Sequence, residues 1–372
     1  MTSEPISHPS ALPQPVRIHL TNVVGLGAVQ LLKSLLPRLE AQVDFDVTDV
    51  YLPGKGDLAS HVAVNPLTAL HRTKRFLPNA LSRVLECTSF GFRYSGRAPL
   101  LVMGDIPIRC QTLQTVFVQT PLLTGSAGTG QRAGAIKYWI ARKLFKSNIR
   151  YVSRFIVQTE AMKISLEQTY PEIAGRVHIV GQPPPEWLLA SGLRRDRPMA
   201  GIQDGMSLFY PAAHYPHKNH SLLSQFGSSL DPDWKVRRLT LTIAPDAHPN
   251  PAQPWIQCVG RLSAQQVLEA YKEADALLFL SQSESLGFPL IEAMWVGLPI
   301  VCPDLPYARV LCGDQAIYFD PADAESLRAA IGDLHRRLQD GWWPNWESRL
   351  AAIPSNWDEV AHRLLQLAAG EA

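Results

Sequence analysis

The chain has 372 residues, of which 46% are hydrophobic and 18% are charged, and its formal net charge is +2. This composition excludes an intrinsically disordered protein, and the small net charge gives no support to a function in nucleic-acid binding. The length suits two domains of ordinary size better than a single core.

The N-terminal segment and the cysteines indicate the cellular compartment in which we expect the protein. Residues 1–15 carry prolines and serines but no apolar core, which predicts a flexible tail and no signal peptide. No apolar run approaches the length of a membrane span. The five cysteines include no Cys-x-x-Cys pair, so we expect neither a zinc site nor a disulfide framework. The expected location is the reducing cytoplasm, with at most peripheral contact at the inner face of the membrane.

Strand-like and helical segments alternate in the first half of the chain. Residues 16–20 predict a strand, which leads into Gly25-Leu-Gly27 and a helical segment over 28–39. A strand, a glycine turn and a helix open many nucleotide-binding α/β domains. Residues 43–51 predict a second strand. Asp44 and Asp46 have the spacing of an Asp-x-Asp metal motif, but they fit the alternating polar positions of that strand, so we predict no metal site.

The next segments continue the alternation. Residues 66–85 predict helical stretches interrupted by Pro78, and residues 99–104 and 115–118 predict buried strands. The last of these strands runs into Gln119. Further strands are expected at 155–157 and 177–180, with a helix over 161–168 between them.

The segment Arg132–Arg154 contains seven arginines and lysines and no acidic residue. Aromatic and aliphatic residues are interleaved at helical spacing, which predicts an amphipathic helix. Its basic face is compatible with two interpretations. It could be a solvated helix face, or it could contact an anionic membrane surface or acceptor.

The second half begins after a charged segment with glycine and proline over residues 187–205, which predicts a linker. A strand at 207–210 leads into a histidine-rich loop, and we expect a helix from Ser221. A strand is predicted at 236–244, and a turn over Val259–Ser263 precedes a helix over 264–274.

The most informative stretch is SQSESLGFPLIEAMWVGLP, residues 281–299, which follows a strand-like run at 276–280. Glu284 lies in the loop that leaves the strand, and Glu292 lies near the start of the following helix. The unpaired amides of a helix start favour an anion, and carboxylates accept hydrogen bonds from hydroxyls. A nucleotide sugar offers both kinds of group.

Glu284 and Glu292, separated by seven residues and followed by Ala293-Met294 and Gly297-Leu298-Pro299, resemble the donor-site signature of family 4 retaining glycosyltransferases. These are group 1 enzymes that include mannosyl- and rhamnosyltransferases. The resemblance implies the GT-B fold, in which two doubly wound α/β Rossmann-like domains face a cleft. It implies an N-terminal acceptor-side domain over residues 16–186, a donor domain over 206–350 and a C-terminal helix over 351–372 that packs back on the first domain.

The resemblance also implies roles for individual residues at the donor. Glu292 would bind the ribose hydroxyls, and Glu284 would lie at the sugar ring. The remaining donor-binding candidates, which would line the sugar, the phosphates or the base, are Gly25, Gly27, His217, Lys218, Asn219, Arg261, Gly287, Phe288 and Pro289. Among them Lys218 would neutralise the leaving diphosphate. The family needs no metal, and no other cofactor is implied.

Three positions depart from the family pattern. Gln119 stands where a histidine is usual, Ala213 where an arginine is usual, and Val310 where a glutamate is usual. Gln119 is still a candidate at the reaction centre, because an amide can bond a sugar hydroxyl, but it does not titrate near neutrality. His214 or His217 could replace the arginine, or they could simply belong to an exposed loop.

The predicted function is therefore transfer of a sugar from a nucleotide diphosphate-sugar to an acceptor hydroxyl with retention of configuration. The expected acceptor is a glycan or a lipid-linked glycan of the bacterial cell surface, and no nucleic-acid partner is expected. Two alternatives stay open. One is a non-catalytic scaffold, which the three departures would suit, and the other is a sugar-nucleotide epimerase, which would need no acceptor.

Overall fold

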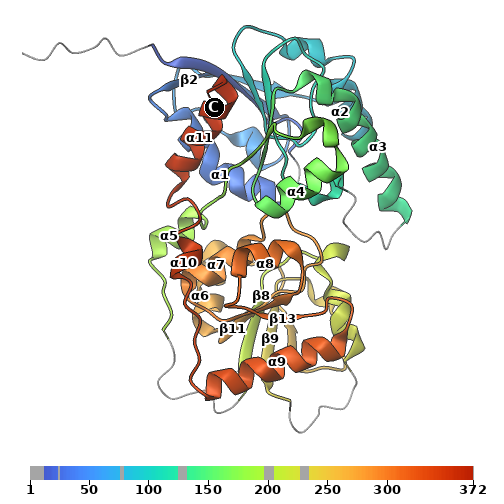
Figure 1. Cartoon of the computed structure of the whole chain (residues 1–372), viewed down its shortest axis with the longest axis vertical. Coiled ribbons are helices and arrows are strands. Elements are labelled where there is room, and N and C mark those ends of the chain that lie inside the picture. The colour runs from blue at the N-terminus through green and yellow to red at the C-terminus, as the bar shows by residue number, and fades with distance from the viewer. Residues whose placement is uncertain are drawn as a thin grey trace, which may run out of the picture. The chain divides into compact units, whose positions relative to one another are not determined.

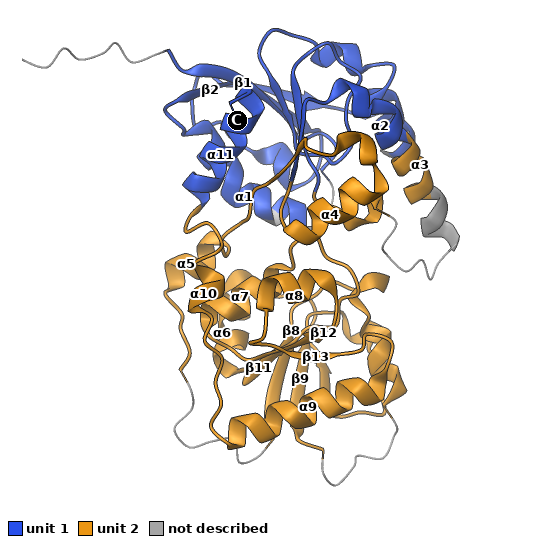
Figure 2. Cartoon of the chain, viewed as in Figure 1, with its two compact units in different colours: residues 1–118, 144–156, 357–372 blue, residues 119–143, 157–356 orange. Residues whose placement is uncertain are grey.

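The computed structural model describes residues 12–23, 26–75, 79–124, 132–196, 205–226 and 234–371. Its elements form two parallel β-sheets with helices (Figure 1). Contacts divide the chain into two compact units (Figure 2), which are residues 1–118, 144–156 and 357–372, and residues 119–143 and 157–356. The domain boundaries expected from the sequence, with a linker over residues 187–205, stay a prediction.

The first sheet has seven strands in the order β3-β2-β1-β4-β5-β6-β7. Every strand pair with a described register in this sheet is parallel. The strands are β1 Gln14–His19, β2 Phe45–Pro53, β3 Ala69–Thr73, β4 Leu100–Val102, β5 Gln114–Phe117, β6 Arg154–Val157 and β7 Val177–Ile179. The helices in this part of the chain are α1 Leu26–Glu40, α2 Asn79–Cys87, α3 Arg132–Asn148, α4 Glu160–Thr169 and α5 Glu186–Ser191.

The second sheet has six strands in the order β10-β9-β8-β11-β12-β13, and its pairs are parallel. The strands are β8 Met206–Tyr210, β9 Val236–Leu241, β10 Ile256–Cys258, β11 Ala276–Leu278, β12 Ile300–Pro303 and β13 Ile317–Phe319. The helices are α6 Ala264–Glu273, α7 Phe288–Val296, α8 Pro306–Cys312, α9 Ala324–Gln339 and α10 Glu347–Leu350. β11 and β12 are fully buried, which explains their continuous apolar sequences.

The C-terminal helix α11, Trp357–Ala369, returns to the first unit. It packs against α1, β1, β4 and β5, and the side chains of Trp357, Leu364 and Leu365 are buried there. A hydrogen bond from the Thr115 hydroxyl on β5 to the Leu367 carbonyl, 3.3 Å, adds a polar contact. The predicted α/β architecture with a returning C-terminal helix is confirmed.

Two local predictions were wrong. Residues 66–85 were expected to be helical, but the structure has strand β3 at Ala69–Thr73 and a helix only from Asn79. β3 contains few strand-favouring residues, and it forms because it pairs with β2 over the register Asp49–Ala69 to Pro53–Thr73. The helix expected from Ser221 is a 3-10 segment, His220–Gln225. Pro78 lies outside the described residues.

Gly297 ends α7 in a conformation that other residues rarely adopt. Its φ is 92°, and a Cβ there would lie 2.6 Å from the Arg195 carbonyl oxygen. Gly192 ends α5 with φ 62°, but a Cβ added there would meet no atom within 4 Å beyond its chain neighbours. The two glycines therefore share a left-handed backbone and differ in the space around them.

We expect Gly297→Ala to lower the free energy of unfolding by about 3 kcal/mol, because backbone strain and a steric clash add. Gly192→Ala should cost only about 1 kcal/mol, because it has the backbone strain alone. Urea unfolding of both variants measures the difference. Equal losses would mean that the Arg195 backbone moves away without cost.

Candidate functional site

Topology identifies one place in the second sheet where ligands bind in folds of this kind. β8 continues to β9 on one side, and β11 continues to β12 on the other, so the strand order reverses between β8 and β11. In open parallel sheets, ligands bind at the carboxyl ends of the strands beside such a reversal. The loops that leave β8 and β11 span residues 211–219 and 279–287. They contain five of the donor-site residues predicted from the sequence, namely His217, Lys218, Asn219, Glu284 and Gly287.

The structure brings Lys218 and Glu284 together at this place. The Lys218 ammonium donates to Glu284 Oε1, and both side chains are largely buried, 15% and 14% exposed. The Lys218 ammonium also lies 5.9 Å from the centre of the Phe279 ring. The pair is a cation and an anion from two different loops, held beside the reversal of strand order.

Backbone contacts fix the two loops against each other. The Gln282 amide donates to the His217 carbonyl at 2.7 Å, and the Tyr210 hydroxyl donates to the Lys218 carbonyl at 2.9 Å. Asn219 has a left-handed backbone, φ 56°, and its side chain donates to the Pro321 carbonyl at 2.9 Å. The backbone around Lys218 is therefore held by several independent bonds.

The histidines of the β8 loop differ in their surroundings. His214 is exposed, whereas His217 is half-buried and its ring stacks on Tyr215 with centroids 5.7 Å apart. Burial lowers the pKa of His217, Lys218 lowers it further, and Glu284 acts in the opposite direction. His220, which the sequence interpretation missed, is buried, and burial together with His214 and Lys218 lowers its pKa to about 4.

Glu292 occupies a separate, buried position in the middle of α7. The Tyr271 hydroxyl on α6 donates to its Oε2 atom at 2.7 Å. Burial raises the pKa of Glu292 to about 7, although the bond from Tyr271 acts in the opposite direction. Tyr271 was missed by the sequence interpretation, because its hydrogen bond to Glu292 joins side chains of two different helices.

The start of α7 lies directly after Glu284. Gly287 has φ 84° and precedes Phe288 and Pro289, which form the first turn. The carbonyl of Ser285 accepts a hydrogen bond from the Thr159 hydroxyl, 3.0 Å, at the start of α4. Pro289 has no N–H and the Leu290 amide donates to the Gly287 carbonyl at 2.9 Å, so the amide of Phe288 is the one in this turn that suits an anionic ligand.

The remaining predicted residues lie elsewhere. Arg261 is exposed in the loop after β10, which is separated from β8 by β9, a distance of about 10 Å between strands. Gln119 is half-buried after β5, and Gly27 lies in α1 of the first unit. Gly25 lies outside the described residues. Among the described residues no group of three or more histidines, cysteines or acidic residues could hold a metal ion.

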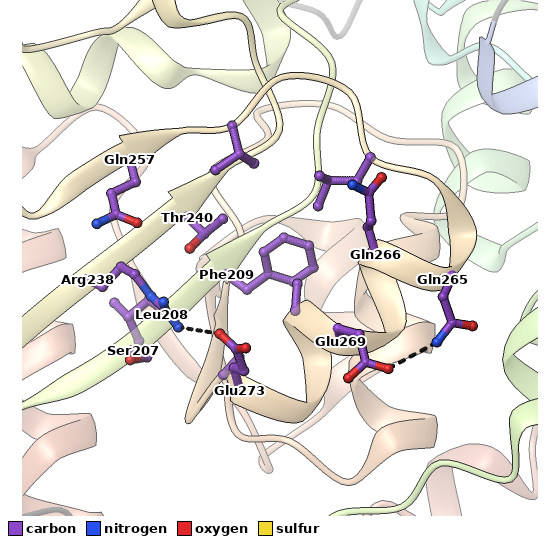
Figure 3. A pocket seen from close by; sticks show the side chains of 14 residues that line it. Ser207, Leu208, Phe209, Arg238, Thr240, Gln257, Gln265, Gln266, Glu269 and Glu273 are labelled. Carbon is purple, nitrogen blue, oxygen red and sulfur yellow. Dashed lines mark hydrogen bonds and ion pairs between the residues drawn. The ribbon is translucent and has the colours of Figure 1, made fainter.

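A separate hollow of about 280 Å³ lies beside α6 and contains none of the predicted site residues. Figure 3 shows it between α6 and the strands β8 to β10. Its wall includes the ion pair between Arg238 on β9 and Glu273 on α6, 2.8 Å, and the bond from Gln265 to Glu269, 3.0 Å. Because it extends to Ser207 at the start of β8, it is a hollow on the sheet face, away from the strand ends that carry Lys218 and Glu284.

Comparison with known proteins agrees with this geometry. Residues 252–337, which include Glu284 and Glu292, match the family model of glycosyl transferases group 1. Serotype-specific mannosyltransferase WbdA of Escherichia coli is 26% identical over 136 residues, 34% of this chain and 16% of that protein. O-antigen chain mannosyltransferase B of Escherichia coli is 30% identical over 89 residues, 24% of this chain and 23% of that protein. The chain thus spans less than a quarter of the length of either relative.

Solved structures define the fold. Sucrose-phosphate synthase from Thermosynechococcus elongatus superposes with a TM-score of 0.62 at 14% identity, over 95% of this chain and 98% of that one. A likeness at this level of identity concerns the fold alone. The shared fold is the two-domain α/β GT-B fold. The match to the group 1 glycosyl transferases thus concerns residues 252–337, and the fold likeness concerns 95% of the chain.

Proposed function

We propose that this protein transfers a sugar, with retention of configuration, from a nucleotide diphosphate-sugar to an acceptor hydroxyl. The observation that carries the proposal is the Lys218–Glu284 ion pair at the strand reversal, beside the first turn of α7. A cation and the positive end of a helix suit a diphosphate, and a carboxylate suits sugar hydroxyls or developing positive charge at the sugar ring. Glu292 would bind the ribose hydroxyls.

The reaction needs one bond to break and one to form at the anomeric carbon. The bond from that carbon to the leaving phosphate oxygen breaks, and the acceptor oxygen bonds to the same face. The acceptor proton goes to the leaving phosphate, since Gln119 cannot act as a base near neutral pH. Lys218 stabilises the charge on the leaving diphosphate, and we propose that no metal is needed for this.

Mannose is the first sugar to test, because both relatives described above are named as mannosyltransferases. Their names also suggest an acceptor that is a growing cell-surface polysaccharide. The purified protein should release nucleotide from one member of a panel of nucleotide sugars, faster with a lipid-linked glycan extract than without it, and equally with EDTA. The anomeric configuration of the product, determined by NMR, tests retention.

Other outcomes of this panel favour the alternatives. No release and no binding of any donor would favour a non-catalytic scaffold. Conversion of the donor into its epimer without an acceptor would favour an epimerase. Loss of activity with EDTA would contradict the proposed metal independence.

We further propose that α3 contacts an anionic membrane surface, with the reaction on the cytoplasmic side. No described helix is long and apolar enough to cross a membrane. On α3, Trp139 is 58% exposed and Ile140 is 41% exposed, and Lys143 lies 5.8 Å from the Trp139 ring. Exposed apolar side chains beside lysines are typical of helices that lie at a lipid interface.

The membrane proposal predicts salt-sensitive binding to vesicles. The protein should sediment with vesicles containing phosphatidylglycerol and not with purely zwitterionic ones. Trp139→Ser should weaken this binding about tenfold, because burial of an indole in the interface is lost. Ile164→Ser on α4 is a matched control, since Ile164 is 47% exposed but outside the basic segment. Equal binding by both variants would exclude α3 as the contact.

A further inference from the structure

The first unit has its own reversal of strand order. β1 continues through α1 to β2 on one side, and β4, on the other side of β1, continues to β5. The segments that leave β1 and β4 meet here, because the Met103 amide donates to the His19 carbonyl at 2.9 Å. A Cβ on Gly104 would lie 2.7 Å from the Asn22 Cβ. Ligands bind at such places in open parallel sheets.

A set of polar and charged side chains surrounds Glu86 of α2 at this place. The His19 ring and the Tyr94 hydroxyl contact Glu86 Oε1 at 3.3 and 2.7 Å, and the Thr21 hydroxyl donates to the same atom. Arg75 Nη2 donates to Oε2 at 2.7 Å. We refer to the set as the Glu86 cluster, and its members are His19, Thr21, Asn22, Arg75, Arg83, Glu86 and Tyr94.

The carboxylate of Glu86 has hydrogen-bond partners at both of its oxygens. Burial acts to raise the pKa of Glu86, but hydrogen bonds from His19, Thr21 and Tyr94 hold it well below its ordinary value. Glu86 therefore stays ionised at neutral pH. Its single negative charge is offset by Arg75, which leaves the positive charge of Arg83 without an acidic partner among the described residues.

Both arginines are held in place with donors to spare. Arg75 uses Nη2 for all its described bonds, to the Thr21 carbonyl at 2.9 Å and to Asn22 Oδ1 and Glu86 Oε2 at 2.7 Å each. Arg83 Nη2 donates to the Asn22 carbonyl, and its buried Nε has no partner among the described residues. A guanidinium fixed along one edge presents its other donors in a fork that matches an oxyanion.

We propose that the Glu86 cluster is the subsite for an anionic oxygen group of the acceptor, with Arg75 and Arg83 as its ligands. A phosphate of a lipid-linked acceptor and a carboxylate of an acidic sugar share this chemistry. The inference rests on the proposed function, because it assigns a chemical class to the acceptor. The buried Nε of Arg83, which has no partner among the described residues, is a donor that such an anion would satisfy.

The test measures binding of inorganic phosphate and of glucuronate to the full chain. The readout is the melting temperature in thermal unfolding. The background is Lys218→Ala, so that phosphate bound at the donor loop does not contribute. One or both anions should raise the melting temperature saturably, and which one does so distinguishes the phosphate source from the carboxylate source. Adding Arg83→Gln should weaken that binding about tenfold, because a charged donor is lost.

Two further variants make the result specific. Arg75→Lys keeps a positive charge beside Glu86 but removes the fork, and it should also weaken binding. Arg97→Gln is the control, because Arg97 is exposed and outside the cluster. No saturable binding of either anion, or equal binding in Arg83→Gln and Arg97→Gln, would overturn the proposal.

The outcome can be separated from that of the proposed function. Release of nucleotide from the donor without acceptor tests the donor site, and the control variant Arg97→Gln should leave it unchanged. If donor release occurs and anion binding fails, only the acceptor subsite is wrong. If anion binding occurs and no donor is used, the proposed transfer is wrong and the anion site stands.

Discussion

Lys218→Ala is expected to reduce nucleotide release from the donor by about 10²–10³-fold, the loss typical when a donor to developing negative charge is removed. In a largely buried loop, the ammonium of Lys218 would face the leaving diphosphate with little competition from water. Its position is fixed by Glu284 and by the bonded backbone on either side. Steady-state kinetics with the best donor should show the loss mainly in kcat.

The same variant should also destabilise the protein. Removal of Lys218 leaves Glu284 largely buried without its cation, which costs about 3 kcal/mol. The double variant Lys218→Ala/Glu284→Gln should recover much of this stability but none of the activity. That separation distinguishes a role in the reaction from a role in folding.

A matched control is available on α6. Lys272 pairs with Glu269 at 2.8 Å, but both side chains are about half exposed, so Lys272→Ala should change stability by less than about 1 kcal/mol. It should leave turnover unchanged. Full activity of Lys218→Ala would contradict the proposed role of Lys218 at the diphosphate.

Features encoded within a short stretch were predictable from the sequence. The strand, turn and helix that carry Glu284, Gly287 and Glu292 are adjacent in the chain, so one short motif could show the resemblance to a family donor site that implied their roles. Lys218 was predicted from the same resemblance, because Lys218-Asn219 matches the donor-phosphate loop of the family. The alternation of strands and helices also sufficed for the fold class, because parallel strands require such crossovers.

Features that depend on packing between distant segments were not predictable. Lys218 and Glu284 are 66 positions apart, and their ion pair follows from the adjacency of β8 and β11. Tyr271 on α6 donates a hydrogen bond to Glu292 on α7, and no pattern in the sequence marks this contact. The Glu86 cluster combines α2, the segment after β1 and the segment after β3, so it was also missed.

The protein should lose stability between about pH 4.5 and pH 7 through Glu292, and Glu292→Gln should remove this loss. The pKa of Glu292 is raised from 4.5 to about 7, so the folded state keeps a proton that the unfolded state releases in this range. Stability from this group is therefore present at low pH and falls as pH rises. The full loss is about 3 kcal/mol, of which about 2 kcal/mol falls between pH 5.5 and pH 8.

Urea unfolding of the wild type and Glu292→Gln at these two pH values measures the effect. The difference in the free energy of unfolding between the two proteins should shift by about 2 kcal/mol in favour of the variant as pH rises. Glu269→Gln, at an exposed position on α6, is the control and should follow the wild type. Parallel curves for the wild type and Glu292→Gln would show that the pKa of Glu292 is not raised.

Tyr271→Phe tests the raised pKa of Glu292 independently. The Tyr271 hydroxyl favours the ionised form of Glu292, so its removal should raise the pKa of Glu292 further and extend the loss of stability to higher pH.

The ionisation of Glu292 should also change the affinity for the donor. Ribose hydroxyls donate most strongly to an ionised carboxylate, so donor affinity should rise with pH through about 7 in the wild type and stay level in Glu292→Gln. A buried glutamate that resists ionisation until the ribose arrives would thus couple donor binding to loss of one proton at this site.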